Sequence, residues 1–255
     1  MKITFLGVGE ACDEWLPNTS ILVQSRAGGE PRMALLDCGF SVPAQFLRLV
    51  SDPEALDGLW ISHFHGDHFF GAPQLLLRFW QEGRRKPLAI IGPAGVREVI
   101  ENCMEMAFAG VLEKVGYPLK YHVMKPGSSL NTAGFGWNAA ESSHGKPCLA
   151  VRISDGETSL FYCGDGRATP QSEQLARGCD LAVHESYYVH PGEKAGHGSV
   201  AECIQFARRA GVKKLALVHL SRDVRRNQKL DIEALMAEAT DVKVFLPEPG
   251  DGVVY

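Results

Sequence analysis

The hydrophobic residues in the first quarter of the chain fall into short runs that contain β-branched and aromatic residues and are bounded by Gly, Pro or Asp. This pattern is typical of β-strands. It predicts four strands, with one short helix between the third and the fourth. The predicted strands are residues 3–6, 20–24, 33–36 and 59–62, and the predicted helix is 44–50.

Helical spacing of hydrophobic residues appears next, in segments that follow Pro or Gly. Further strands are predicted in the middle of the chain, and strands and helices alternate towards its end. The predicted helices are 73–81, 95–108, 199–210 and 230–239, and the predicted strands are 88–91, 119–123, 136–140, 149–153, 159–163, 181–184, 214–219 and 242–246.

A β-rich half followed by an alternating half predicts two sheets packed face to face, with helices on their outer sides. This is a four-layer αββα sandwich of the α/β (α+β) class. No internal repeat, low-complexity tract or long linker divides residues 1–255, so we expect a single domain.

Composition and charge are those of an ordinary globular protein. The chain is 45% hydrophobic and 22% charged, which is enough to bury a sizeable core. The formal net charge of −4 provides no general attraction to nucleic acid. The cationic clusters are residues 84–86 and Arg222 with Arg225 and Arg226, and we expect both to be solvated turns rather than polyanion sites.

The cysteines and the N-terminal residues indicate in which cellular compartment the protein is expected. The seven cysteines are scattered and contain no Cys-x-x-Cys pair, which argues against a disulfide framework and a zinc ribbon. The chain begins directly with a predicted strand, without the pattern of a signal peptide. No segment approaches the roughly 18 apolar residues that span a bilayer. We therefore expect a cytoplasmic protein with no membrane partner.

A dense group of metal-binding residue types follows the strand predicted at 59–62. His63, His65, Asp67 and His68 lie within six consecutive positions. Nitrogen and oxygen donors together suit zinc, and also manganese or iron. His63 and His65 point the same way in an extended segment, whereas Asp67 and His68 come after Gly66 and can face a second point. The group predicts half of a two-metal site rather than a solvated loop.

Three later residues lie at or just beyond the ends of predicted strands, where the missing ligands would be needed. They are His144, Asp165 and His219. Each alone is typical of a structural histidine or a turn aspartate. Together with the first group, they are candidate metal ligands. His122 and His190 have no such context and are expected to be surface or core residues.

The order His63-x-His65-x-Asp67-His68, His144, Asp165, His219 resembles the metallo-β-lactamase superfamily. Within it, the chain is most similar to the ribonuclease Z-like branch of phosphodiesterases. The resemblance spans nearly the whole chain and implies a single metallo-β-lactamase-like hydrolase domain. It also includes the segments Phe5-Leu6-Gly7-Val8-Gly9, Asn18-Thr19-Ser20, Leu36-Asp37-Cys38-Gly39, His184-Glu185-Ser186, His197-Gly198-Ser199 and His219-Leu220-Ser221.

The resemblance implies two divalent metal ions, with zinc preferred and manganese or iron as alternatives. Such ions, about 3.5–4 Å apart, lower the pKa of a bridging water and hold a phosphodiester oxygen, so that a metal-bridging hydroxide attacks. The ligands that it implies are His63, His65 and His144 for one ion, Asp67, His68 and His219 for the other, and Asp165 for both.

The resemblance also implies catalytic roles for Asp67, His197 and Glu185. Asp67 would orient or deprotonate the nucleophile. His197 would protonate the leaving oxygen or hold a phosphate oxygen, with Glu185 fixing its ring. Asp37 would support the histidines of the first metal. The residues alone leave other interpretations open, namely a polar turn at His197 and a strand-end turn at Asp37, and His184 fits a packing role as well as a metal contact.

Two departures from the branch bear on the substrate. Only 20 residues separate His144 from Asp165, so the protruding arm of tRNA-maturing ribonucleases Z is absent. Phosphate contacts supply much of nucleic-acid affinity, so a small or cyclic phosphodiester or nucleotide fits better than RNA. The tRNA 3′-processing endoribonuclease is the alternative. Arg222 directly follows Ser221, one position earlier than the usual arginine of the branch, which leaves its phosphate-binding role in doubt.

Other functions remain open on the same fold. They are a lactone, thioester or β-lactam hydrolase, a di-iron redox protein, and a non-catalytic metal-binding scaffold. The di-iron proteins usually carry Glu at the position of His65 together with a flavin domain, for which this chain has no room. A homodimer is possible, with the helix at 95–108 as an interface, although a core position fits that helix better.

Overall fold

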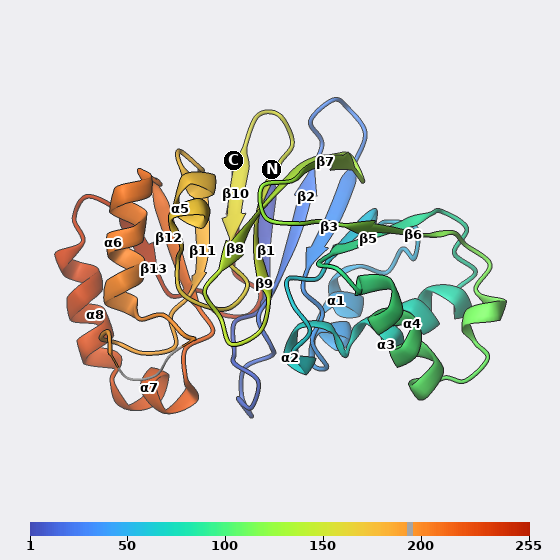
Figure 1. Cartoon of the computed structure of the whole chain (residues 1–255), viewed down its shortest axis with the longest axis horizontal. Coiled ribbons are helices and arrows are strands. Elements are labelled where there is room, and N and C mark those ends of the chain that lie inside the picture. Colours follow the sequence, from blue (N-terminus) through green and yellow to red (C-terminus); the bar gives the residue numbers. More distant parts are fainter. Residues whose placement is uncertain (193–195) are drawn as a thin grey trace.

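Two mixed β-sheets form the centre of the molecule. The computed structural model describes residues 1–192 and 196–255. Within these residues the strand order is β14-β1-β2-β3-β4-β5-β6 in the first sheet and β13-β12-β11-β10-β9-β8-β7 in the second. Figure 1 shows the two sheets side by side, with helices on the outer side of each. The predicted four-layer αββα architecture is confirmed.

The first sheet is antiparallel from β14 to β3 and parallel from β3 to β6. Its parallel strands are joined by helices, as parallel crossovers require. The strands are β1 (Lys2–Gly7), β2 (Ser20–Ser25), β3 (Arg32–Leu36), β4 (Gly58–Trp60), β5 (Leu88–Gly92), β6 (Leu119–Val123) and β14 (Gly252–Val254), and the helices are α1 (Val42–Leu49), α2 (Gly66–Phe69), α3 (Ala72–Gln81), α4 (Val96–Ala107) and the 3₁₀ turn η1 (Leu112–Lys114).

The second sheet has the same division, antiparallel from β7 to β10 and parallel from β10 to β13. Its strands are β7 (Ser129–Thr132), β8 (Phe135–Ser142), β9 (Cys148–Ser154), β10 (Ser159–Tyr162), β11 (Leu181–Glu185), β12 (Lys214–Val218) and β13 (Lys243–Phe245), and its helices are α5 (Pro170–Ala176), α6 (Val200–Ala210), α7 (Arg222–Asn227) and α8 (Lys229–Glu238).

Three hydrophobic layers separate the four layers of secondary structure. The central layer lies between the sheets, where Trp60 of β4 stacks on Trp137 of β8 with ring centroids 6.0 Å apart. A second layer joins the first sheet to α1, α3 and α4, and a third joins the second sheet to α5, α6 and α8. Val96, Ile100 and Met104 of α4 are buried in the second layer, so this face of α4 belongs to the core.

The two cationic clusters are solvated turns only in part, since Arg85 and Lys86 are exposed after α3. Arg84 is buried, and its guanidinium donates to the carbonyl oxygens of residues 53, 56, 86 and 87. Arg222, Arg225 and Arg226 lie on the short helix α7. Each of these three pairs with a glutamate. The prediction was wrong for Arg84 and for the second cluster, because a run of basic residues does not reveal buried carbonyl oxygens or carboxylates distant in sequence.

No helix within the described residues is long and apolar enough to cross a membrane.

Candidate metal centre

The seven candidate ligands all lie at one edge of the two sheets, at or beyond the ends of strands. His63, His65, Asp67 and His68 follow β4, with the last two on α2, and so belong to the first sheet. The other three follow β8, β10 and β12 of the second sheet. The centre therefore lies where the two sheets meet. Five of the seven residues are buried, and the partly exposed ones are His65 and His144.

One group of donors consists of His63, His65, His144 and Asp165, which the structure brings together. His65 Nδ1 lies 3.0 Å from His63 Nε2 and 3.2 Å from His144 Nε2. Asp165 Oδ2 lies 3.7 Å from His63 Nε2. Donors bound tetrahedrally to zinc at 2.0–2.1 Å are separated by about 3.3 Å. The spacing of these atoms therefore fits a common metal ion.

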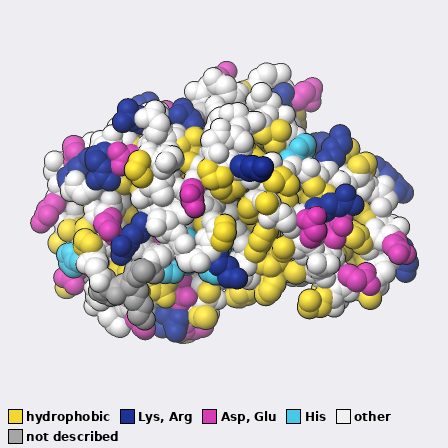
Figure 2. Space-filling view, viewed as in Figure 1, with side chains coloured by type: hydrophobic (Ala, Val, Ile, Leu, Met, Phe, Trp, Pro, Cys, Tyr) yellow, Lys and Arg dark blue, Asp and Glu magenta, His cyan; other side chains and the backbone are white. Residues whose placement is uncertain are grey.

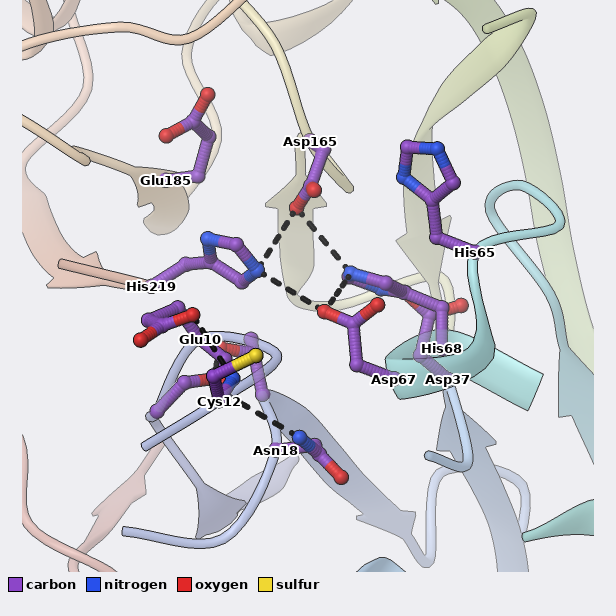
Figure 3. A network of polar contacts seen from close by, with 12 residues as sticks. Glu10, Cys12, Asn18, Asp37, His65, Asp67, His68, Asp165, Glu185 and His219 are labelled. Carbon is purple, nitrogen blue, oxygen red and sulfur yellow. Dashed lines mark hydrogen bonds and ion pairs between the residues drawn. The ribbon is translucent and has the colours of Figure 1, made fainter. Parts of the chain in front are cut away.

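A second group consists of Asp67, His68, Asp165 and His219, all buried. His68 Nε2 lies 3.2 Å from Asp67 Oδ2 and 3.3 Å from Asp165 Oδ1. His219 Nε2 lies 3.3 Å and 3.5 Å from the same two oxygens. Figure 3 shows this ring of contacts, in which each carboxylate faces both imidazoles. Asp165 is shared with the first group.

Asp37 contacts the second group on the side that faces away from the converging donor atoms. It has a positive φ of 59° just after β3, which directs its carboxylate towards α2. Its Oδ2 lies 2.7 Å from His68 Nδ1 and accepts hydrogen bonds from the hydroxyls of Ser62 and Tyr162. Ser62 Oγ also lies 3.0 Å from His63 Nδ1. Asp37 thus contacts a histidine of the second group directly and reaches the first group only through Ser62, which corrects the prediction.

The outward nitrogen of His144 is also held. Its Nδ1 lies 2.8 Å from the carbonyl oxygen of Gly196 and donates to it, which leaves Nε2 as a lone-pair donor facing the centre. A fixed tautomer of this kind is what metal-binding histidines require. The pattern is the same as for His68, where Asp37 fixes Nδ1 and Nε2 faces inward.

The buried imidazoles and carboxylates of the two groups shift one another's pKa values. Burial and the charge of His68 lower the pKa of His63 to about 2. Burial opposes charge on His219 and His68 too, but the facing carboxylates outweigh it, raising the pKa of His219 to about 9 and that of His68 well above its usual value. Burial would raise the pKa of Asp67 and Asp165, yet the imidazoles hold both well below the usual range. Positive charge beside Asp67 and Asp165 therefore stabilises their ionised, buried carboxylates.

The donor set fits divalent cations. His68 Nε2 and Asp165 Oδ1 make no hydrogen bond of acceptable geometry with any described residue, although they lie 3.3 Å apart and are fully buried. Buried polar atoms without partners are costly. Imidazole nitrogens and carboxylate oxygens that converge in this way are the ligands that zinc and similar metals prefer.

Glu185 and His197 lie beside the second group. The Glu185 carboxylate is completely buried and accepts hydrogen bonds from the backbone amides of Gly166, Tyr187 and Gly198. Its Oε1 also lies 3.2 Å from His197 Nδ1. These contacts occupy both carboxylate oxygens, and one of them is made with the His197 ring. The His197 ring is parallel to that of His219, with centroids 6.1 Å apart.

His184 packs structurally. Its ring lies against Phe161 and Phe206, and its Nδ1 contacts the carbonyl oxygen of Glu185. Sequence reasoning did not identify Ser62, Tyr162 or Tyr187 as part of the site. Hydroxyl residues in or near buried strands have no pattern that distinguishes them, and only the Ser62 position, directly before His63, gave a local signal.

The sequence of the chain matches a known domain family over most of this region. A model of the beta-lactamase superfamily domain matches residues 32–220, which include all the candidate ligands. The chain belongs to the beta-lactamase superfamily. The resemblance seen in the sequence is thereby confirmed, and the protein is a metal-dependent hydrolase.

Relatives within the superfamily include ribonucleases Z and BN. The chain is 30% identical to ribonuclease BN of Escherichia coli O6:K15:H31, with 87% of this chain and 89% of the relative covered. It is 27% identical to ribonuclease BN of Cronobacter sakazakii, with 93% and 94% covered. It is 26% identical to ribonuclease Z of Methanosarcina acetivorans, with 87% and 88% covered.

Solved structures of the superfamily share the fold. The human short-form tRNase Z superposes with a TM-score of 0.80 at 22% identity, covering 100% of this chain and 99% of that one. The metallo-beta-lactamase fold protein YhfI of Bacillus subtilis gives a TM-score of 0.79 at 22% identity, covering 99% and 98%.

Proposed function

We propose that this hydrolase is a binuclear phosphodiesterase in which His197 is the general acid. The observation that carries the proposal is the pairing of His197 with the buried Glu185 beside the two donor groups. Hydrolysis of a lactone, thioester or β-lactam on the same fold involves no phosphoryl oxygen for a histidine to hold. The Glu185–His197 pair can hold a phosphoryl oxygen as well as protonate the leaving oxygen, which favours a phosphodiester.

The ligand assignment follows the two donor groups. His63, His65 and His144 would hold one ion and Asp67, His68 and His219 the other, with Asp165 shared. Nitrogen-rich donor sets favour zinc, and manganese or iron are the alternatives. When bound, such ions acidify water, position it and neutralise the phosphoryl oxygens.

The chain's own residues supply the proton transfers. Asp67 Oδ2 lies at the inner side of the second group, where it can accept a proton from the attacking water. Glu185 Oε1 accepts from His197 Nδ1–H, so the imidazolium form of His197 has its Nε2 proton available for the leaving oxygen. The backbone amides around Glu185 fix the position of this carboxylate, which keeps His197 Nδ1 as the nitrogen that donates to it.

A small or cyclic phosphodiester or nucleotide is the substrate class we propose. The stretch between His144 and Asp165 forms only β9 and β10 with a tight turn, and no arm protrudes from it. The alignment with the Cronobacter relative spans 292 positions although this chain has 255 residues, so the relative contains segments that this chain lacks. On the face in Figure 2, basic and acidic side chains are interspersed. RNA binding typically uses a continuous basic surface.

The second candidate is tRNA 3′ processing. It is favoured by the ribonuclease Z and BN names of relatives that match over nearly the full length. The test is a hydrolase panel with zinc- or manganese-loaded protein, containing linear and cyclic dinucleotides, bis(p-nitrophenyl) phosphate, precursor tRNA, a chromogenic lactone and a cephalosporin. We expect turnover of the small phosphodiesters. Cleavage of precursor tRNA with no small-substrate turnover would support the second candidate, and turnover of carbonyl substrates alone would refute both.

A further inference from the structure

The ring of Tyr187 lies on the imidazole of His197. The two ring centroids are 4.6 Å apart and the planes are inclined by 30°, a stacked arrangement. Tyr187 is two residues beyond Glu185 and just past the end of β11. One short segment therefore provides both the carboxylate that holds His197 Nδ1 and an aromatic face for its ring.

The backbone at His197 cannot by itself fix the ring. His197 lies between Gly196, with a φ of 95°, and Gly198, and its side chain is 25% exposed. A single hydrogen bond from Nδ1 to Glu185 leaves the imidazole free to rotate about that bond. The edge of the His144 ring, with centroids 5.1 Å apart, and the face of Tyr187 restrict this rotation from two sides.

Tyr187 is itself firmly held. Its backbone amide donates to Glu185 Oε2 at 3.1 Å, and its carbonyl oxygen accepts from the Ser221 amide at 3.1 Å. Its hydroxyl lies near the side chains of Ser221, Glu10 and Arg222. Ser221 is two residues beyond His219. Tyr187 thus joins the His197–Glu185 pair to the loop that carries His219.

We infer that Tyr187 is a positioning residue for His197, holding the plane of the imidazole so that Nε2 is directed at the leaving oxygen. This inference rests on the proposed function. In that reaction a water oxygen bonds to phosphorus while the bond from phosphorus to the leaving oxygen breaks. His197 Nε2 gives its proton to that oxygen, and the proton lost by the water restores the imidazolium.

The test compares two substrates that differ only in the basicity of the leaving group. Methyl phenyl phosphate releases a basic phenolate that needs a proton, whereas methyl p-nitrophenyl phosphate releases a weakly basic one. We expect Tyr187→Leu to lower kcat about 10-fold on the first and to change it less than about twofold on the second. Tyr187→Phe keeps the aromatic face and should keep both rates. His197→Ala should show the same selectivity with a larger loss.

Phe40→Leu is the matched control, because Phe40 is exposed near the same edge and makes no ring contact with a histidine among the described residues. An independent readout is the NMR signal of the His197 ring in zinc-loaded protein, assigned from the spectrum of His197→Ala. Tyr187→Leu should remove the ring-current shift of that signal, and Tyr187→Phe should retain it.

The outcomes separate the inference from the proposed function. Equal loss on both substrates in Tyr187→Leu, or equal behaviour of Tyr187→Phe and Tyr187→Leu, would overturn the positioning role. A His197 signal that stays at its wild-type position in Tyr187→Leu would also overturn the positioning role. If the wild-type protein hydrolyses neither phosphodiester, the proposed function itself fails.

Discussion

At the scale of single residues, the centre depends on partners that hold the outer nitrogens of His68 and His144. Asp37 is the main example, since it faces His68 and binds Ser62 and Tyr162. Its positive φ places the carboxylate behind the donors rather than among them. Metal affinity should therefore depend on this residue even though it touches no metal ion.

We predict that Asp37→Asn weakens metal binding about 10- to 100-fold, because the amide no longer fixes the Nδ1 proton of His68. Competition with a chromophoric chelator measures the affinity. Tyr162→Phe removes one neutral donor to the same carboxylate and should have a much smaller effect. Unchanged affinity in Asp37→Asn would show that His68 is held by other contacts.

The sequence singled out the candidate donors that the structure brings together, because His and Asp are rare enough for their spacing to stand out. His63, His65, Asp67 and His68 form a local motif, and the structure brings His144, Asp165 and His219 to it. The partner of Asp37 was assigned to the wrong group of histidines, because spacing along the chain does not reveal which ring a carboxylate faces. The contact between Tyr187 and His197 likewise has no local signal.

At the scale of elements, buried strands were predictable because their hydrophobic runs are continuous. β4, β5, β11 and β12 are buried almost throughout, and all were expected near their observed positions. Several short elements were missed. They are α2, α5, α7, β7 and β14, whose formation depends on tertiary contacts rather than on a hydrophobic period.

The turn after α3 is held by Arg84, whose guanidinium donates to four backbone carbonyls and lies 5.1 Å from the ring centroid of Phe79. We predict that Arg84→Met lowers the free energy of unfolding by about 3–5 kcal/mol, because buried carbonyl oxygens lose their donors. Arg84→Lys should also destabilise, since one ammonium cannot span four acceptors. Urea unfolding measures both variants.

Arg85→Met is the control for this experiment, because it removes the same charge from an exposed neighbouring position. Its stability should lie within about 0.5 kcal/mol of wild type. Similar stabilities for the Arg84 and Arg85 variants would contradict a structural role for the buried guanidinium.

At the scale of the whole molecule, the centre joins the two sheets. His63 to His68 come from the first sheet, whereas His144, Asp165 and His219 come from the second. Bound metal would therefore link both halves across the central hydrophobic layer. We predict that chelation lowers Tm by several degrees and that zinc restores it, because metal binds the folded state. Calorimetry with and without chelator measures the shift, and Asp165→Ala should abolish it.

We propose above all that a binuclear centre in this protein hydrolyses phosphodiesters. The most direct measurement titrates metal-free protein with zinc or manganese and follows bound metal and turnover of bis(p-nitrophenyl) phosphate in the same samples. We predict that activity rises until two ions are bound per chain and then remains constant. Full activity with one bound ion would contradict the binuclear centre, and no phosphodiester turnover with two bound ions would contradict the proposed reaction.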